Sequence, residues 1–385
     1  MKRAFALLLA VLLLCGTAAC TSREVKVEQP EETAAPTPAP SPKPTPEPTQ
    51  EPVPEATPEP TPEITPEPTQ KPVPVEEPAF RDLFNGAGRD EPNTDRPFAV
   101  MINNIREAQP QCGVKDADII YEVLAEGGVT RMMAIFSDIR KAEHLGSVRS
   151  IRPYYIDISL AYGAVTCHAG GSDDAYSRLK YDHVENIDGV RGTYPMTVFS
   201  RDQARIASGY AVEHTLFTEG ENLYKCAETL NYDLTLPAGY DNGLRFVADG
   251  TPENGEVAET VKVVFNSGKA TTLNYHKDTG LYTAKQHGGS YDDGNSKEPV
   301  TFRNVLAIWA PTRVLDNYGR LQINLIGSGE GYFACGGQYV NIKWSRDSVK
   351  DCFHYYLADG SEVQLGEGTT YIAVLSNGQS SITLE

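Results

Sequence analysis

Apolar positions between about residues 80 and 150 occur in short runs separated by polar and glycine-rich segments. Residues 98–102 form an apolar run directly after Pro97, and 119–125 and 129–136 form two more, joined at Gly127-Gly128. Runs of this length between turn residues are typical of buried strands. The pattern therefore predicts three strands in this part of the chain.

Helix signals follow these strands. Proline is favoured in the first turn of a helix, so Pro153 predicts a helix that runs through Tyr162 and ends at Gly163. Residues 164–168 read as another strand. Ser172 is a good N-cap and predicts that a second helix begins there. Strands thus alternate with helices up to about residue 230.

From about residue 240 the pattern becomes that of β-structure. A hairpin is predicted where 272–275 and 281–284 flank the turn 277–280. Further strands are predicted at 261–265, 306–309, 321–325, 339–344, 353–356 and 371–374. The glycine-rich stretch 327–331 lacks the lysine and following helix of a phosphate-binding loop, so we interpret it as a flexible turn.

These patterns predict the fold class and the domains. We expect an α/β (or α+β) N-terminal domain at 80–235, followed by a mainly antiparallel β C-terminal domain at 236–385. Roughly 300 residues suffice for two modest domains.

The first 20 residues have the pattern of an export signal. Lys2 and Arg3 precede an apolar run at 4–14, which is too short for a permanent membrane span of roughly 20 residues. Small residues then lead directly into Cys20, as in the lipobox of bacterial lipoproteins. Residues 1–20 therefore predict a lipoprotein signal peptide with Cys20 as the lipidated residue. Cleavage near Ala19 with ordinary secretion is the alternative, because Thr17 stands where lipoboxes usually carry leucine.

A proline-rich segment separates this signal from the predicted domains. Residues 21–79 hold 18 of the chain's 27 prolines and many Glu and Thr residues. Such a composition cannot bury a core and predicts a disordered, semi-rigid spacer. At about 3.1 Å per residue it could extend on the order of 180 Å. We expect it to hold the folded part away from the outer face of the cytoplasmic membrane.

The negative net charge of the chain limits the kinds of molecule that it can bind. The chain has a net charge of −18, and residues 80–385 carry −12 of it. An acidic body without a basic run excludes a general nucleic-acid binder. It also disfavours direct binding of anionic polymers or membranes, unless one local pocket is basic.

Five cysteines remain after Cys15 and Cys20 are set aside: Cys112, Cys167, Cys226, Cys335 and Cys352. No CxxC spacing occurs, so no metal site is predicted. An odd number cannot all pair internally. Cys335 and Cys352, on predicted neighbouring strands, are the only pair that suggests a disulfide, and buried free thiols are the favoured alternative.

Several motifs between residues 96 and 173 are similar to those of the YerB-like lipoproteins. They are the runs at 109–113, 117–122, 126–131, 148–154 and 168–172. The resemblance extends over most of residues 90–385. It implies a lipoprotein signal, a low-complexity spacer and a pair of domains in the cell envelope, but no reaction, since the family is classed as a domain of unknown function. The chain departs from the family pattern at His214-Thr215, where the family has a His-Asn pair.

A candidate anion-binding site emerges around the two predicted helix starts. Arg149 and Arg152 precede the first helix, where arginine forks and unpaired N–H groups both favour anions. His168 ends a predicted strand. The complete predicted ligand-binding set is Arg149, Arg152, His168, Gly170, Gly171, Ser172, Glu122 and Arg131.

Two observations oppose this site. Asp173 and Asp174 lie in the first turn of the second helix, where they would satisfy its dipole and repel an anion. Arg149 and Arg152 could instead pair with Glu122, Glu126 or Asp157 in a buried network. The sequence favours neither interpretation over the other.

The chain carries no recognised catalytic motif. The patterns of serine hydrolases, zinc proteases and P-loop proteins are all missing from the sequence. We therefore expect a lipid-anchored envelope protein that binds a cell-wall ligand or a partner protein. The alternative is an envelope enzyme that handles a phosphate-linked or wall-polymer substrate through a pocket of Arg149, Arg152 and His168. No cofactor can be assigned from the sequence.

Overall fold

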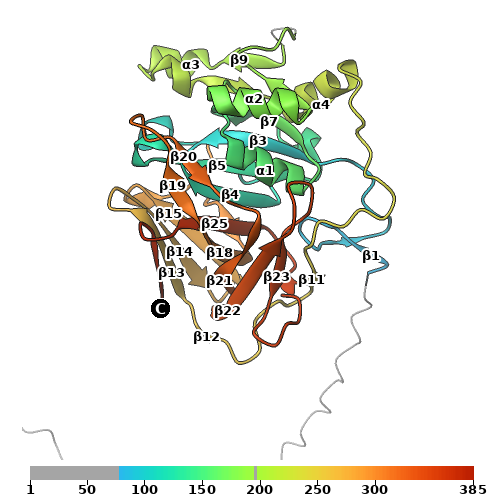
Figure 1. Ribbon diagram of the computed structural model, residues 1–385, viewed down its shortest axis with the longest axis vertical. Coiled ribbons are helices and arrows are strands. Elements are labelled where there is room, and N and C mark those ends of the chain that lie inside the picture. The colour runs from blue at the N-terminus through green and yellow to red at the C-terminus, as the bar shows by residue number, and fades with distance from the viewer. Residues whose placement is uncertain (1–77, 195–196) are drawn as a thin grey trace, which may run out of the picture. The chain divides into compact units, whose positions relative to one another are not determined.

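One large mixed sheet runs through both predicted regions of the chain (Figure 1). The computed structural model describes residues 78–194 and 197–385, so the predicted signal peptide and nearly all of the spacer lie outside the described residues. The sheet has the order β12-β22-β21-β18-β25-β4-β5-β3-β7-β8, with β23 paired to β22. Its strands are β12 (Glu256–Val257), β22 (Gln338–Arg346), β21 (Gly327–Cys335), β18 (Asn304–Ala310), β25 (Thr370–Ser376), β4 (Ile119–Leu124), β5 (Thr130–Phe136), β3 (Phe98–Asn103), β7 (Val165–His168), β8 (Asn186–Asp188) and β23 (His354–Tyr356).

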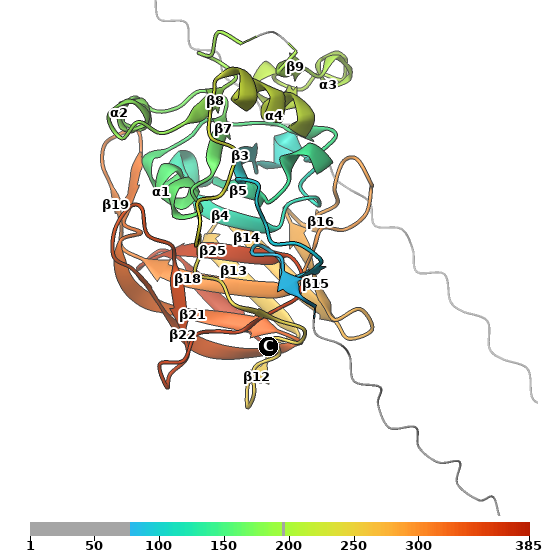
Figure 2. The ribbon, with the colours of Figure 1, turned by 90° about the vertical axis from the view of Figure 1, so that its right-hand side faces the viewer.

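A second, antiparallel sheet packs on one face of the large one, and two helices pack on the other (Figure 2). The second sheet contains β16 (Gly289–Ser290), β15 (Leu281–Gln286), β14 (Lys269–His276), β13 (Thr260–Asn266), β26 (Ser381–Leu384) and β17 (Thr301–Phe302). The helices are α1 (Pro153–Ala161) and α2 (Asp173–Tyr181). Among the described residues, no helix has the length and apolar character needed to cross a membrane.

Other helices and strand pairs complete the fold. The other helices are α3 (Gln203–Ala207), α4 (Gly220–Thr229), η1 (Arg106–Ala108), η2 (Glu126–Gly128), η3 (Ile139–Lys141) and η4 (Val212–His214). The other strand pairings join β1 (Phe80–Arg81) to β2 (Gly88–Arg89), β10 (Leu216–Thr218) to β6 (Leu145–Gly146) and β9 (Phe199–Arg201), β11 (Phe246–Val247) to β24 (Leu365–Gly366), and β19 (Thr312–Val314) to β20 (Leu321–Ile323).

The period-2 geometry of strands places two cores on opposite faces of the large sheet. In β3, Val100 and Ile102 join the core against the second sheet, while Ala99 and Met101 join the core beneath α1. Strand β4 alternates in the same way. Its fully buried Glu122 follows Tyr121, which faces the α1 side, and therefore lies on the face covered by the second sheet.

The observed architecture confirms the predicted fold class of a mixed α/β region followed by a mostly antiparallel β region. The predicted flexible turn at 327–331 is wrong, because these residues form the first half of β21. The glycines of this strand allow close packing: a Cβ on Gly329 would lie 2.5 Å from the Trp344 indole nitrogen, and one on Gly331 would lie 2.5 Å from the Ala307 carbonyl oxygen.

Candidate functional site

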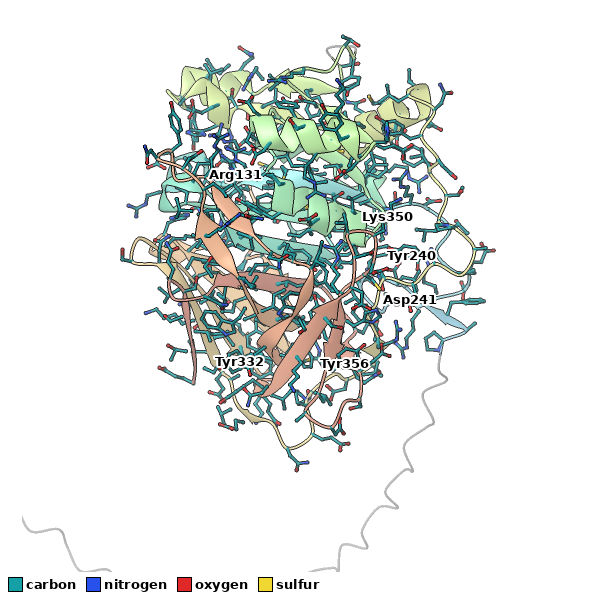
Figure 3. The ribbon with its side chains drawn as sticks, viewed as in Figure 1. Arg131, Tyr240, Asp241, Tyr332, Lys350 and Tyr356 are labelled. Carbon is teal, nitrogen blue, oxygen red and sulfur yellow. The ribbon has the colours of Figure 1, made fainter. Side chains whose placement is uncertain are left out.

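Three of the predicted site residues form an arginine cluster, defined here as Arg131, Arg149 and Arg152. Arg131 comes from the start of β5, and the other two lie in the segment that leads into α1. The Arg131 side chain is 9% exposed, and its Nη1 donates to the Ser150 carbonyl at 2.7 Å. Figure 3 labels Arg131 in the upper half of the molecule.

Arg152 is held by a carboxylate. Its Nε donates to Glu126 Oε2 at 3.0 Å, its Nη2 donates to Glu126 Oε1, and the pair has bidentate geometry. The Arg131 guanidinium lies 3.8 Å from the same Glu126 oxygen. One carboxylate from η2 therefore serves two arginines, and Glu126 is the partner that the sequence offered beside Glu122 and Asp157.

Arg149 is the least satisfied member of the cluster. Its Nη1 reaches the Glu213 carbonyl at 3.4 Å, and its Nη2 lies 3.8 Å from the carboxylate of Glu213, a side chain that is 60% exposed. Its buried Nε has no hydrogen-bond partner among the described residues. Burial lowers the pKa of Arg149, and the nearby Arg131 lowers it further. Arginine nevertheless stays charged in proteins. The positive charge of Arg149 is therefore only partly neutralised within the arginine cluster.

The cluster has more positive than negative charge. Three guanidinium groups share two carboxylates, those of Glu126 and Glu213, and one of the two is largely solvated. Charge-assisted hydrogen bonds from arginine to carboxylate or phosphate are the strong ones in proteins. An anion that docks against Arg149 would supply the missing acceptor for its Nε.

His168 lies apart from this cluster in its contacts. The side chain has no exposed surface, Nδ1 lies 2.8 Å from the Gly170 carbonyl, and Nε2 lies 3.2 Å from Asn186 Oδ1. Burial lowers the pKa of His168, although Asp188, 3.7 Å away, acts in the opposite direction. This enclosed imidazole, with both ring nitrogens held by protein groups, orders the end of β7.

Protein groups already engage the two glycines that precede α2. Gly170 has a positive φ of 77°, and its N–H donates to Asp188 Oδ1 at 2.8 Å. Gly171 forms a backbone bridge to Ile151. Ser172 occupies the N-cap position but makes no side-chain cap bond, and its buried hydroxyl has no partner among the described residues. The Asp188 carboxylate thus takes the place that a bound anion would have at the Gly170 N–H.

Glu122 does not pair with the arginines. It lies 3.0 Å from Lys269 Nζ in β14, and the side chains are 0% and 4% exposed. Burial alone raises the pKa of Glu122, but Lys269 and hydrogen bonds from Thr130, Tyr371 and Thr271 outweigh burial and lower it. Lys269 could not be identified from the sequence as the partner of Glu122. The alternating pattern of a strand shows which of its residues are buried, but not which strand of another sheet packs against them.

The remaining predictions concern the cysteines and metal binding. The five cysteines of the folded part are free thiols, as favoured, and Cys335 and Cys352 form no disulfide. All are buried except the half-buried Cys352, whose Sγ lies 3.4 Å from His354 Nε2. Within residues 78–194 and 197–385, no group of three or more His, Cys, Asp or Glu side chains is placed to hold a metal ion.

Comparisons with known proteins identify relatives of the chain. Residues 85–233 match the family described as "Protein of unknown function (DUF3048) N-terminal domain", and residues 261–372 match its C-terminal counterpart. The protein named "Putative lipoprotein YerB" from Bacillus subtilis strain 168 is 30% identical over 255 residues, which are 65% of this chain and 73% of that protein.

A solved structure agrees with this relationship. The crystal structure of the YerB protein from Bacillus subtilis superimposes with a TM-score of 0.68 at 26% identity, and the match covers 79% of this chain and 99% of that one. Sequence and fold therefore agree over both matched regions. The chain belongs to the DUF3048 family of YerB-like proteins, whose function is not known.

Proposed function

We propose that this protein is an extracytoplasmic lipoprotein that is anchored to the outer face of the cytoplasmic membrane through Cys20. Its folded part binds an anionic ligand of the cell envelope at the arginine cluster. The signal-like residues 1–20 and the proline-rich spacer support the anchor. The name of the Bacillus subtilis relative, which calls it a lipoprotein, supports the same assignment.

The unpartnered, buried Nε of Arg149 carries the ligand-binding part of the proposal. A buried polar group without a partner costs free energy, typically about 1–3 kcal/mol and more for charged groups. A ligand oxygen at this position would remove that cost. Most of the protein repels anions, since residues 80–385 have a net charge of −12. An anion is therefore attracted to the arginine cluster and repelled by most of the surrounding surface.

Binding is favoured over catalysis by the position of His168. The enzymatic alternative needs this imidazole beside Arg149 and Arg152 as an acid or base. A catalytic base must come within hydrogen-bond reach of the proton it transfers, and the enclosed His168 ring has its nitrogens turned to Gly170 and Asn186. The geometry thus supports a binding protein.

A thermal-shift screen of the purified full chain tests the proposal. The panel contains glycerol and ribitol phosphates, polyprenyl phosphates and muropeptides. A ligand that binds only the native state at 100 times its Kd adds about 2.7 kcal/mol of stability. We expect an anionic member to raise the Tm of the wild type and to have little effect on Arg149→Ala.

Arg140→Ala is the matched control, because the Arg140 guanidinium already contacts the carboxylates of Asp95 and Asp138. This variant should respond to the ligand as the wild type does. No shift with any anionic member, or an equal shift in wild type and Arg149→Ala with every member that stabilises the wild type, would contradict ligand binding at the cluster.

A further inference from the structure

A second basic region lies where the second sheet meets the loop after β3. A cavity of about 570 Å³ opens there. Its lining is Arg106, Lys262, Val264, Asn266, Ser267, Gly268, Lys269, Ala270, His287 and Gly288. The lining contains three basic side chains and a histidine but no Asp or Glu. We call this cavity the basic recess.

The cations of the basic recess are only partly neutralised. Arg106 donates from Nη2 to the His287 carbonyl at 2.9 Å, and it forms no ion pair within 4 Å in the part of the chain that the structure describes. Lys262, an exposed residue of β13, likewise has no ion pair with any described residue. Two charges therefore face the recess without a carboxylate beside them.

Lys269 forms the buried end of the basic recess. Its ammonium donates to Glu122 and to Gln286 Oε1. An ammonium group has three N–H donors, and the described residues supply a partner for two of them. The Lys269 side chain is only 4% exposed, and it lines the cavity. The fold therefore holds this ammonium group in place with one N–H donor left for a ligand.

His287 lies in the positive electrostatic potential of the basic recess. Its Nε2 lies 3.2 Å from the Asn104 carbonyl. Burial lowers the pKa of His287, and the next largest effect is the positive charge of Lys269. The imidazole is therefore neutral at pH 7, and the charge of the recess comes from its arginine and lysines.

We propose that the basic recess is a second binding site and that it takes the phosphate group of a phosphate mono- or diester. Its three cations come from three elements, η1, β13 and β14, and approach from different directions. A carboxylate offers two oxygens in one plane, whereas a tetrahedral phosphate presents up to four. Arginine forks and lysine point charges are both common phosphate partners, and the cavity has the size of small-ligand sites.

The basic recess is distinct from the arginine cluster and does not depend on it. Residues 126–128 lie between the two. On one side Glu126 binds Arg152, and on the other the Gly128 carbonyl accepts a hydrogen bond of 2.7 Å from Asn266 Nδ2, in the recess lining. Substitutions at either place can therefore be tested separately.

Titration of the purified full chain with inorganic phosphate and with glycerol 3-phosphate tests the proposal. Isothermal calorimetry or ³¹P NMR would give the Kd. Arg106→Gln and Lys262→Gln should each raise it by about tenfold, as expected when a charge-assisted hydrogen bond is lost. Both side chains are exposed, so the Tm of the free protein should stay unchanged.

Lys285→Gln is the matched control. Lys285 is an exposed lysine of β15 in the same sheet, and it does not line the recess. This variant should keep the wild-type Kd for phosphate. Lys269 is left intact because its pairing with Glu122 makes it part of the core.

Three results with soluble phosphates would overturn the proposal. They are no phosphate binding up to millimolar concentrations, an unchanged Kd in both recess variants, and an equal loss in Lys285→Gln. Vesicles of phosphatidylglycerol are run beside the soluble phosphates. Binding to vesicles alone would also overturn the proposal, because it would indicate general attraction to an anionic surface.

Discussion

At the scale of single residues, the most consequential contact is the buried pair of Glu122 and Lys269. Glu122 accepts hydrogen bonds at 2.6–2.9 Å from Thr130, Thr271, Tyr371 and Asn104 in addition to its contact with the lysine. Every acceptor position of the carboxylate is thus used between two sheets. Such a network is stable only when all its members are present.

We predict that Lys269→Met destabilises the protein by about 3 kcal/mol at pH 7, because removal of one partner leaves a buried charge uncompensated. Glu122→Gln combined with Lys269→Met should regain a large part of this loss. Urea denaturation measures both values. The exposed Lys285→Met serves as control and should stay within about 0.5 kcal/mol of wild type. A similar effect of both lysine substitutions would refute the role of the pair.

A second prediction at this scale concerns pH. The pKa of His168 is lower in the folded protein than in the unfolded chain, so the unfolded chain binds more protons between the two values. Stability therefore falls as the pH drops from about 6.5 through the folded pKa, by at most about 1.4 kcal/mol per pH unit. His168→Gln should show a shallower loss between pH 7 and pH 5 in denaturation curves.

The exposed His276→Gln is the control for this measurement and should keep the wild-type slope. An identical pH slope in wild type and His168→Gln would show that His168 is not held neutral by the fold.

The partners of single charges were the least predictable feature of the sequence. The sequence offered Glu122, Glu126 and Asp157 as partners for Arg149 and Arg152. In the structure, Glu126 pairs with Arg152, Glu122 with Lys269, and Asp157 with Arg178. The local sequence around each of the three carboxylates is compatible with an arginine partner. Which one pairs with an arginine depends on how distant strands pack together.

At the scale of elements, local patterns predicted most strands and both helices around the site. The apolar runs at 98–102 and 371–374 became β3 and β25, and Pro153 begins α1. The failure at β21 has a physical cause. Its glycines carry no side chains to show an alternating pattern, yet small residues are needed there because Trp344 and neighbouring backbone lie against the strand.

We predict that Gly331→Ala destabilises the protein by about 1–3 kcal/mol, because the added Cβ would lie 2.5 Å from the Ala307 carbonyl oxygen. Thermal or urea unfolding gives the value. Ser328→Ala, at an exposed position of the same strand, should change stability by less than about 0.5 kcal/mol. If Gly331→Ala behaves like Ser328→Ala, close packing of β21 is not what requires glycine.

At the scale of the whole molecule, the large sheet joins regions that the sequence pattern separates. Strand β25 pairs in parallel with β4, so that residues 370–374 lie beside 119–123. No local pattern could predict a pairing over such a distance. The division at 80–235 and 236–385 remains a prediction about independent folding, and the shared sheet gives a reason to test it.

We predict that a fragment of residues 78–235 does not fold stably alone. It would leave the β4 edge without β25 and would expose Glu122 and the apolar face that the second sheet covers. Exposed strand edges and apolar faces favour aggregation. Solubility and limited proteolysis of the fragment, compared with residues 78–385, measure this. A soluble, protease-resistant fragment would show that the N-terminal region is an independent domain.

We propose that a lipid anchor at Cys20 holds a folded binding protein outside the membrane. Labelling of producing bacterial cells with radioactive palmitate, followed by membrane fractionation, tests it most directly. We expect a labelled protein in the membrane fraction, with label and membrane attachment lost in Cys20→Ser and kept in Cys15→Ser. An unlabelled wild-type protein released into the medium would contradict the anchor and support ordinary secretion.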